Sequence, residues 1–152
     1  MNDRAMHAAT LFENGYNCAQ AVAVAFHDCI GMEEKAAAAM ASSFGGGMGR
    51  MREVCGAVSG MLLVAGILYG YDTPGDDRVK MEHYRRVQFL AEGFRQEAGS
   101  IVCREILKNP PSDPSPTPRS AEFYKLRPCS RLVYCAAETL QQYMQENPPA
   151  ER

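Results

Sequence analysis

The sequence predicts an all-α fold, a single-domain helical bundle of about six to seven helices around a Gly-rich, buried central helix. Successive segments repeat apolar residues at helical spacing and are bounded by capping residues, glycines or prolines. No segment alternates convincingly between apolar and polar residues, as a half-buried strand would. The chain has 152 residues, which fits one domain, so residues 1–152 are expected to form a single unit.

Three helices are expected in the first part of the chain. Apolar residues recur at helical spacing over residues 3–14, where Gly15 ends the pattern. Asn17 is a good N-cap for a second helix over residues 17–28. Residues 33–43 are alanine-rich with acidic residues first, which suits a helix N-terminus.

The central helix is expected over residues 52–69, after a flexible glycine-rich loop at residues 45–49. It carries two pairs of glycines spaced by four residues, which clear a strip of its surface: Gly56, Gly60, Gly66 and Gly70. Each glycine costs roughly 0.5–1 kcal/mol relative to alanine in a helix interior, so a compensating gain is needed. Close helix packing, or the helix end, explains the second pair. At Gly56, beside Cys55, packing and the approach of a cofactor or reactive sulfur are equal alternatives.

One segment has the length of a short membrane span. Residues 54–71 run without a charged side chain, at the lower limit for a spanning helix. Glycines, a serine and a cysteine dilute its hydrophobicity. A buried helix is therefore favoured, and no membrane span is expected.

The second half of the chain is expected to hold three further helices. A long amphipathic helix is predicted over residues 76–97, a short one over 101–107 and a last one over 128–145. Residues 109–118 contain five of the nine prolines and are expected to form an extended loop, and residues 146–152 a frayed tail. The apolar face of the long helix is predicted to bury Val79, Tyr84, Val87, Leu90, Ala91 and Phe94.

Composition excludes some classes of function. Charge is nearly balanced, with 16 basic and 18 acidic residues and a net charge of −2. Nucleic-acid binding would need a basic excess or stripe, so no nucleic-acid partner is expected. Residues 1–10 lack the apolar stretch of a signal peptide, which favours a cytoplasmic location. Permanent disulfides are less expected there, which favours metal-binding or redox roles for the cysteines.

The chain contains six cysteines but no Cys-x-x-Cys pair. This absence argues against thioredoxin-like motifs and the usual zinc spacings. Four cysteines are expected at or near helix N-termini: Cys18 after Asn17, Cys55 near the start of the central helix, Cys103 three residues after the N-cap candidate Ser100, and Cys129 after Pro128. Cys29 and Cys135 are expected to be packing residues.

Helix N-termini favour a thiolate, because free backbone N–H groups and the helix dipole stabilise negative charge. Basic residues near the cysteines act in the same direction: Arg50, Arg52, Arg104, Arg127 and Arg131. Cys55 is expected to be the reactive thiolate, because a helix start, Gly56 and two arginines all favour its ionised form.

A glycine motif accompanies the cysteines. The hexapeptide Cys55-Gly56-Ala57-Val58-Ser59-Gly60 follows a Gly-rich stretch at residues 44–49. Together with Cys18, Cys103 and Cys129, in that order, it resembles the C-GCAxxG-C-C family of redox-active proteins. The resemblance covers nearly the whole chain, and the Pro-rich loop between the third and fourth cysteines departs from the family pattern. It implies a redox role, with a redox partner protein or a transporter-associated protein as partner, and leaves a homo-oligomer open.

Three mechanisms are open at this point. In the first, which the sequence favours, thiolates of Cys18, Cys55, Cys103 and Cys129 hold an iron–sulfur cluster for electron transfer. In the second, no metal is bound and Cys55 attacks a disulfide as the reactive thiolate. In the third, the chain is a non-enzymatic helical adaptor of a transporter, and the same four sulfurs bind a structural zinc.

Residues near the cysteines complete the predictions. Glycines are expected to bring backbone N–H groups to a cofactor at four positions: Gly47, Gly49, Gly56 and Gly60. Met48 and Met51 are expected to fill the core. His7, His27 and His83 are isolated, and His83 is expected on a solvated face.

Overall fold

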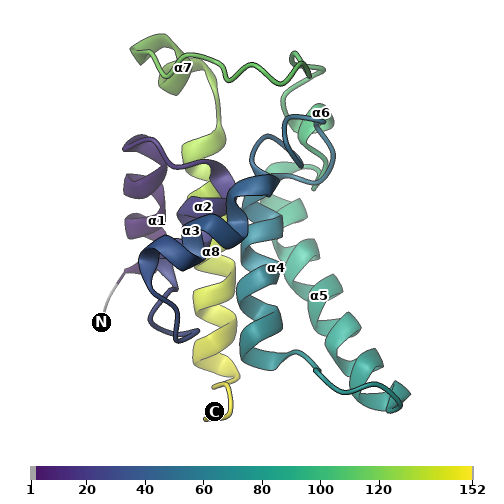
Figure 1. Cartoon of the computed structure of the whole chain (residues 1–152). Helices are drawn as coiled ribbons and strands as arrows, with labels where there is room; N and C mark the ends of the chain where they lie inside the picture. Colours follow the sequence, from purple (N-terminus) through teal and green to yellow (C-terminus); the bar gives the residue numbers. More distant parts are fainter. Residues whose placement is uncertain (1–2, 152) are drawn as a thin grey trace.

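Figure 1 shows a chain built of helices, which confirms the predicted all-α class. The computed structural model describes residues 3–151, so residues 1, 2 and 152 of the predicted domain lie outside the described part. In chain order the elements are α1 (Arg4–Glu13), α2 (Cys18–Ala25), α3 (Glu34–Ala41), the 3₁₀ helix η1 (Ser42–Phe44), α4 (Gly56–Tyr69), α5 (Asp77–Ala98), α6 (Cys103–Ile106), α7 (Ala121–Leu126) and α8 (Cys129–Glu146).

Side-chain caps explain where several helices begin. Asn17 caps α2 as predicted: it accepts the Gln20 N–H at 2.8 Å, and the Gln20 side chain accepts the Asn17 N–H at 3.1 Å. Asp3 and Asp76 accept backbone N–H groups at the starts of α1 and α5. Gly99, with φ 88°, ends α5 in the left-handed conformation.

Two predicted helix starts are wrong. α4 begins at Gly56, because Arg52, where the start was predicted, has a left-handed backbone with φ 61°. Ser100 does not cap α6. Its hydroxyl accepts the N–H of Val102, the residue just before the helix, at 3.0 Å, and the helix starts at Cys103.

The apolar pattern did not predict α7, which raises the number of α-helices in the described chain to eight. Six residues are too few to show a helical period, but Ser120 caps them by accepting the Phe123 N–H at 3.2 Å. Phe123 and Tyr124 then pack against Phe12 of α1, with ring centroids 6.3 and 6.0 Å apart. This contact fastens the end of the Pro-rich loop to the bundle.

Five helices, α1, α2, α4, α5 and α8, share the main hydrophobic core, and α3 packs on the side of α2. The largest fully buried side chains are Phe12, Phe26, Phe94, Met61, Leu90 and Leu140. α4 is buried along most of its length, as predicted for the central helix, but α2 is buried just as deeply. Within residues 3–151 no helix is both long and apolar enough to cross a membrane.

Two glycines of α4 allow its backbone to touch α2. A Cβ atom at Gly60 would lie 2.6 Å from the Ala19 carbonyl oxygen, and one at Gly56 would lie 3.2 Å from the Ala19 backbone nitrogen and 2.8 Å from the Phe44 carbonyl oxygen of η1. Close packing is therefore confirmed at these two positions. It is wrong at Gly66, where a Cβ would meet nothing within 4 Å.

The long helix α5 leaves the bundle toward its N-terminal end, as Figure 1 shows. Leu90 and Phe94 are buried as predicted, whereas Val79 and Tyr84 are 40% and 50% exposed. The helical pattern continues beyond the point where the other helices can cover it. The prediction that His83 lies on a solvated face is wrong. His83 is buried, and its Nδ1 lies 2.9 Å from Arg86 Nη1.

We expect Gly60→Ala to lower the free energy of unfolding by about 1–3 kcal/mol, the usual cost of overpacking a core. Gly66→Ala is the matched control on the same helix, and it should raise stability by about 0.5–1 kcal/mol because alanine is the better helix former. Urea unfolding followed by far-UV circular dichroism measures both. Equal effects at the two positions would contradict the contact between α4 and α2.

Candidate functional site

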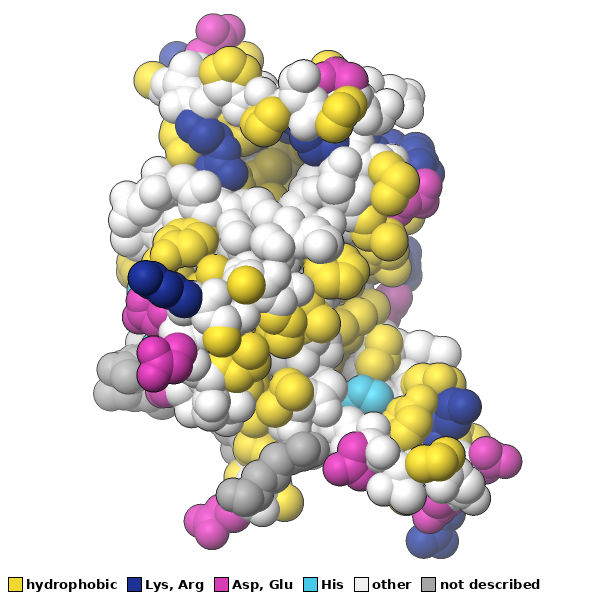
Figure 2. All heavy atoms as spheres, in the orientation of Figure 1, with side chains coloured by type: hydrophobic (Ala, Val, Ile, Leu, Met, Phe, Trp, Pro, Cys, Tyr) yellow, Lys and Arg dark blue, Asp and Glu magenta, His cyan; other side chains and the backbone are white. Residues whose placement is uncertain are grey.

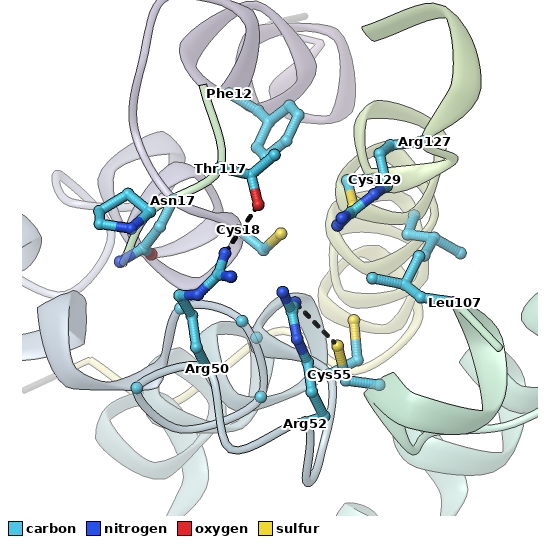
Figure 3. A pocket seen from close by; sticks show the side chains of 18 of the residues that line it. Phe12, Asn17, Cys18, Arg50, Arg52, Cys55, Leu107, Thr117, Arg127 and Cys129 are labelled. Carbon is cyan, nitrogen blue, oxygen red and sulfur yellow. Dashed lines mark hydrogen bonds between the residues drawn. The ribbon is translucent and has the colours of Figure 1, made fainter. Parts of the chain in front are cut away.

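Four of the six cysteines line a single cavity of about 450 Å³: Cys18, Cys55, Cys103 and Cys129. The cavity lies where the N-termini of α2, α4, α6 and α8 meet, under the Pro-rich loop (residues 109–118) and beside the Gly-rich loop (residues 45–49). Figure 3 shows the sulfur atoms of Cys18 and Cys129 facing the same central space. Helices far apart in the sequence thus bring these thiols together.

Each of these cysteines stands at a helix start, as predicted. Cys18, Cys103 and Cys129 are the first residues of α2, α6 and α8, and Cys55 is the N-cap residue of α4. The other two cysteines lie elsewhere. Cys29 follows α2 and Cys135 lies within α8, and both are half-buried against the main core, which agrees with the predicted packing role.

Cys18 and Cys129 form a thiol pair across the cavity. Interaction with the Cys18 thiol, together with Arg127, Arg119 and Arg52, lowers the pKa of Cys129 to about 7 although burial opposes it. The same interaction raises the pKa of Cys18 well above its ordinary range, and burial raises it further. Near pH 7 Cys129 is therefore partly ionised while Cys18 keeps its proton.

Cys55 and Cys103 form the opposite side of the cavity. The isolated antiparallel bridge between Val54 and Val102 joins their backbones, and the Cys55 N–H donates to the Ile101 carbonyl at 2.7 Å. Burial raises the pKa of Cys55 to about 12, although the N–H groups at the start of α4 oppose the shift. The expected lowering of the Cys55 pKa is thus wrong, because desolvation outweighs the helix N-terminus.

The Gly-rich loop coils left-handedly beside Cys103. Gly46, Gly47, Met48, Gly49 and Arg50 all have φ between 56° and 73°. A Cβ at Gly47 would lie 2.8 Å from the Cys103 Cβ, so only glycine lets the backbone come this near. The coil turns Met48 and Met51 outward, to 39% and 56% exposure, so the prediction that they fill the core is wrong.

The predicted cofactor-binding glycines separate into two groups. Gly47, Gly49 and Gly56 line the cavity, whereas Gly60 lies against Ala19 of α2 and is not part of the lining. Gly56 also lies against Cys18, since a Cβ there would lie 3.2 Å from the Cys18 Cβ.

Arginines dominate the charge of the cavity. The residues of the described chain that line it include Arg50, Arg52, Arg119 and Arg127 and no carboxylate. Arg104, a predicted neighbour of the site, is instead paired with Glu53 at 2.6 Å on the exposed side.

Sequence reasoning missed Arg119. Its guanidinium donates to the Phe12 and Tyr16 carbonyls, at 2.9 and 3.0 Å, and stacks over the Phe12 ring. The residues beside Arg119 in the chain give no local signal of a role at the site.

A family comparison supports the redox interpretation. Residues 16–143 match the family described as "Putative redox-active protein (C_GCAxxG_C_C)". The chain belongs to this family. All four cavity cysteines and the glycine motif fall within the matched region. No curated protein and no solved structure matches the chain.

We expect iodoacetamide to modify Cys129 faster than Cys55 at pH 7, since the pKa is about 7 for Cys129 and about 12 for Cys55. Because its pKa is lowered, Cys129 is mostly thiolate above about pH 7 and mostly thiol below it. The rate of Cys129 labelling should therefore fall as pH drops through about 7. Mass spectrometry of the labelled peptides over a pH series measures both rates.

The matched variants test the effect of Cys18 on Cys129. Cys18→Ala removes the thiol that lowers the Cys129 pKa and should move the midpoint upward, whereas Cys18→Ser keeps a polar O–H group and should move it less. An unchanged midpoint in Cys18→Ala, or faster labelling of Cys55 than of Cys129, would contradict the assignment.

Proposed function

We propose that the chain is a thiol–disulfide redox protein in which Cys129 is the nucleophile and Cys18 the resolving thiol. The observation that carries the proposal is that the two thiols face the same space of one cavity (Figure 3), beside arginines that favour negative charge on Cys129. A low-pKa thiolate beside a second thiol is the arrangement that thiol–disulfide exchange requires. This proposal keeps the metal-free mechanism foreseen from the sequence but moves the attacking thiolate from Cys55 to Cys129.

The reaction runs in two exchanges. The Cys129 thiolate attacks one sulfur of a disulfide, so that a mixed disulfide forms and the other half leaves as a thiolate. That leaving thiolate takes the proton of Cys18, and the Cys18 thiolate then attacks the Cys129 sulfur and releases the second half. Two electrons pass from the two cysteines to the disulfide substrate, and a Cys18–Cys129 disulfide remains. A reducing thiol small enough to enter the cavity would restore the thiols by the reverse steps.

Arginines assist the first exchange. Arg127, Arg119 and Arg52 all favour negative charge on Cys129, so they stabilise the attacking thiolate before the substrate arrives. Cys55 and Cys103, with raised pKa values, stay protonated at neutral pH. We expect a reducing compartment such as the cytoplasm, where the pair would start as thiols.

Oxidation with a neutral small disulfide tests the pair. In the wild-type chain, peptide mapping should find a Cys18–Cys129 link with the loss of two thiols. Cys129→Ser should abolish the reaction, because a hydroxyl is no substitute for a thiolate, and Cys18→Ser should stop at the mixed disulfide on Cys129. Cys135→Ser, outside the cavity, is the control and should behave as wild type. A stable mixed disulfide on wild-type Cys129, or a link that includes Cys55, would contradict the proposal.

A second candidate is an iron–sulfur cluster for electron transfer, held by Cys18, Cys55, Cys103 and Cys129. The specific observation in its favour is that four thiols line one cavity, since clusters commonly take four thiolates. Across residues 3–151, however, no three His, Cys, Asp or Glu side chains are grouped closely enough to hold a metal ion, so the thiols would have to move inward. A structural zinc in a transporter adaptor would use the same sulfurs.

Metal analysis separates these candidates. If the cluster is correct, protein purified without oxygen should be brown and contain iron and acid-labile sulfide, and Cys129→Ser should lose both. Zinc without iron would favour the adaptor. Protein without iron, sulfide or zinc, also after reconstitution, would leave the thiol pair as the redox centre.

A further inference from the structure

Arg52 has a buried guanidinium with an unused donor. The residue is 4% exposed, and its Nε donates to the Pro111 carbonyl at 2.9 Å while Nη1 lies 3.7 Å from the Cys103 sulfur. Among the described residues, Arg52 Nη2 is the buried side-chain nitrogen or oxygen that lacks a hydrogen-bond partner. A buried cation with an unpartnered N–H is unfavourable, so this atom points to an anionic ligand.

The walls around Arg52 indicate what kind of anion would fit. Positive charge comes from three more arginines and no lining residue is acidic, while apolar side chains such as Ile106, Leu107 and Leu132 form much of the remaining surface. Figure 3 shows Arg52 and Arg127 directed toward the same space as the sulfurs of Cys18 and Cys129. The cavity therefore suits a molecule with an anionic group and an apolar body.

The covering loop limits the size of the ligand. Arg50 donates to the Asp113 carbonyl and the Thr117 hydroxyl, both at 2.8 Å, and Arg52 holds Pro111, so the Pro-rich loop is tied across the cavity. Figure 2 shows Lys and Arg side chains at a hollow beneath this part of the chain. Cys129 is only 8% exposed. A small molecule can enter such a hollow, whereas a disulfide on the surface of a folded protein would be held away from the sulfur.

We propose that the substrate of the Cys18–Cys129 pair is a low-molecular-weight organic disulfide that bears a carboxylate, bound in the cavity with the carboxylate on Arg52 and Arg127. This inference rests on the proposed thiol–disulfide function and adds the substrate class to it. A guanidinium binds a carboxylate through two parallel N–H donors, and Arg52 Nη2 is available for one of them. Arg127, half-buried over the Phe123 ring at 5.3 Å, contributes a second positive charge.

The substrate and the two cysteines supply all the electrons and protons that the reaction needs. Cys129 attacks the nearer sulfur and the S–S bond of the substrate breaks. The leaving half takes the Cys18 proton and departs as a thiol. Cys18 then displaces the second half from Cys129 as a thiolate, so the substrate gains two electrons and the cysteine pair loses two.

Three disulfides of similar size and different charge test the substrate class: 3,3′-dithiodipropionate (anionic), bis(2-hydroxyethyl) disulfide (neutral) and cystamine (cationic). Each rate of thiol loss in the full chain is divided by the rate of 2-mercaptoethanol with the same disulfide, which removes the intrinsic reactivity of the probe. We expect the normalised rate to be about tenfold or more higher for the anionic than for the neutral disulfide, and lowest for cystamine.

Variants test the assigned arginines. Arg52→Gln should reduce the ratio of anionic to neutral rates toward one, and Arg127→Gln should reduce it in part. Arg52→Gln also removes the contact to Pro111 and could unfold the loop. In that case Arg127→Gln, which leaves this contact in place, still tests the assignment. Arg85→Gln, on the exposed face of α5, is the matched control and should keep the wild-type ratio.

The outcomes separate this inference from the function on which it rests. If the neutral disulfide links Cys18 to Cys129 but the anionic one reacts no faster after normalisation, the substrate class is wrong and the thiol pair stands. If none of the three disulfides forms the link, both proposals fail. An anionic preference that survives both arginine variants would also overturn the binding assignment.

Discussion

The direct contact between the backbones of α4 and α2 is the constraint on which the core and the site both depend. Gly60 lies against the Ala19 carbonyl, and Gly56 lies where any side chain would strike the Cys18 Cβ and the Phe44 carbonyl. Because two helices can approach this closely only without a Cβ in between, the glycines set the distance from the start of α2 to the start of α4. That distance decides how near Cys18 can come to Cys55, and it positions both against the start of α8.

Burial then determines which thiol ionises. A helix N-terminus favours an anion by about 0.3–1 kcal/mol at the surface and up to about 2 kcal/mol when partly buried. Removing an unpaired charge from water costs more than that, so Cys55 stays protonated although it stands at the start of α4. Cys129 is buried too, but the Cys18 thiol and arginines from three separate segments lower its pKa. Neighbours, rather than the helix start alone, make the thiolate.

The Pro-rich loop and α7 link the ionisation of Cys129 to the entry of substrate into the cavity. Residues 109–118 form neither helix nor strand, so their backbone offers free carbonyl groups that Arg50 and Arg52 bind. Arg119 anchors the far end on α1. The same arginines thus hold the Pro-rich loop over the cavity and give the cavity its positive charge. A change in the loop would therefore alter both substrate entry and the ionisation of Cys129.

Much of this protein is determined by local sequence. Helical periodicity, the Asn17 cap and the glycines of α4 predict the elements, and the cap positions place four cysteines at helix starts. Tertiary structure alone decided that Cys18 pairs with Cys129, that Arg119 faces the cavity, that His83 is buried and that Met48 is exposed. The physical reason is that capping and periodicity depend on residues within a few positions, whereas desolvation and charge–charge contacts depend on elements that only folding brings together.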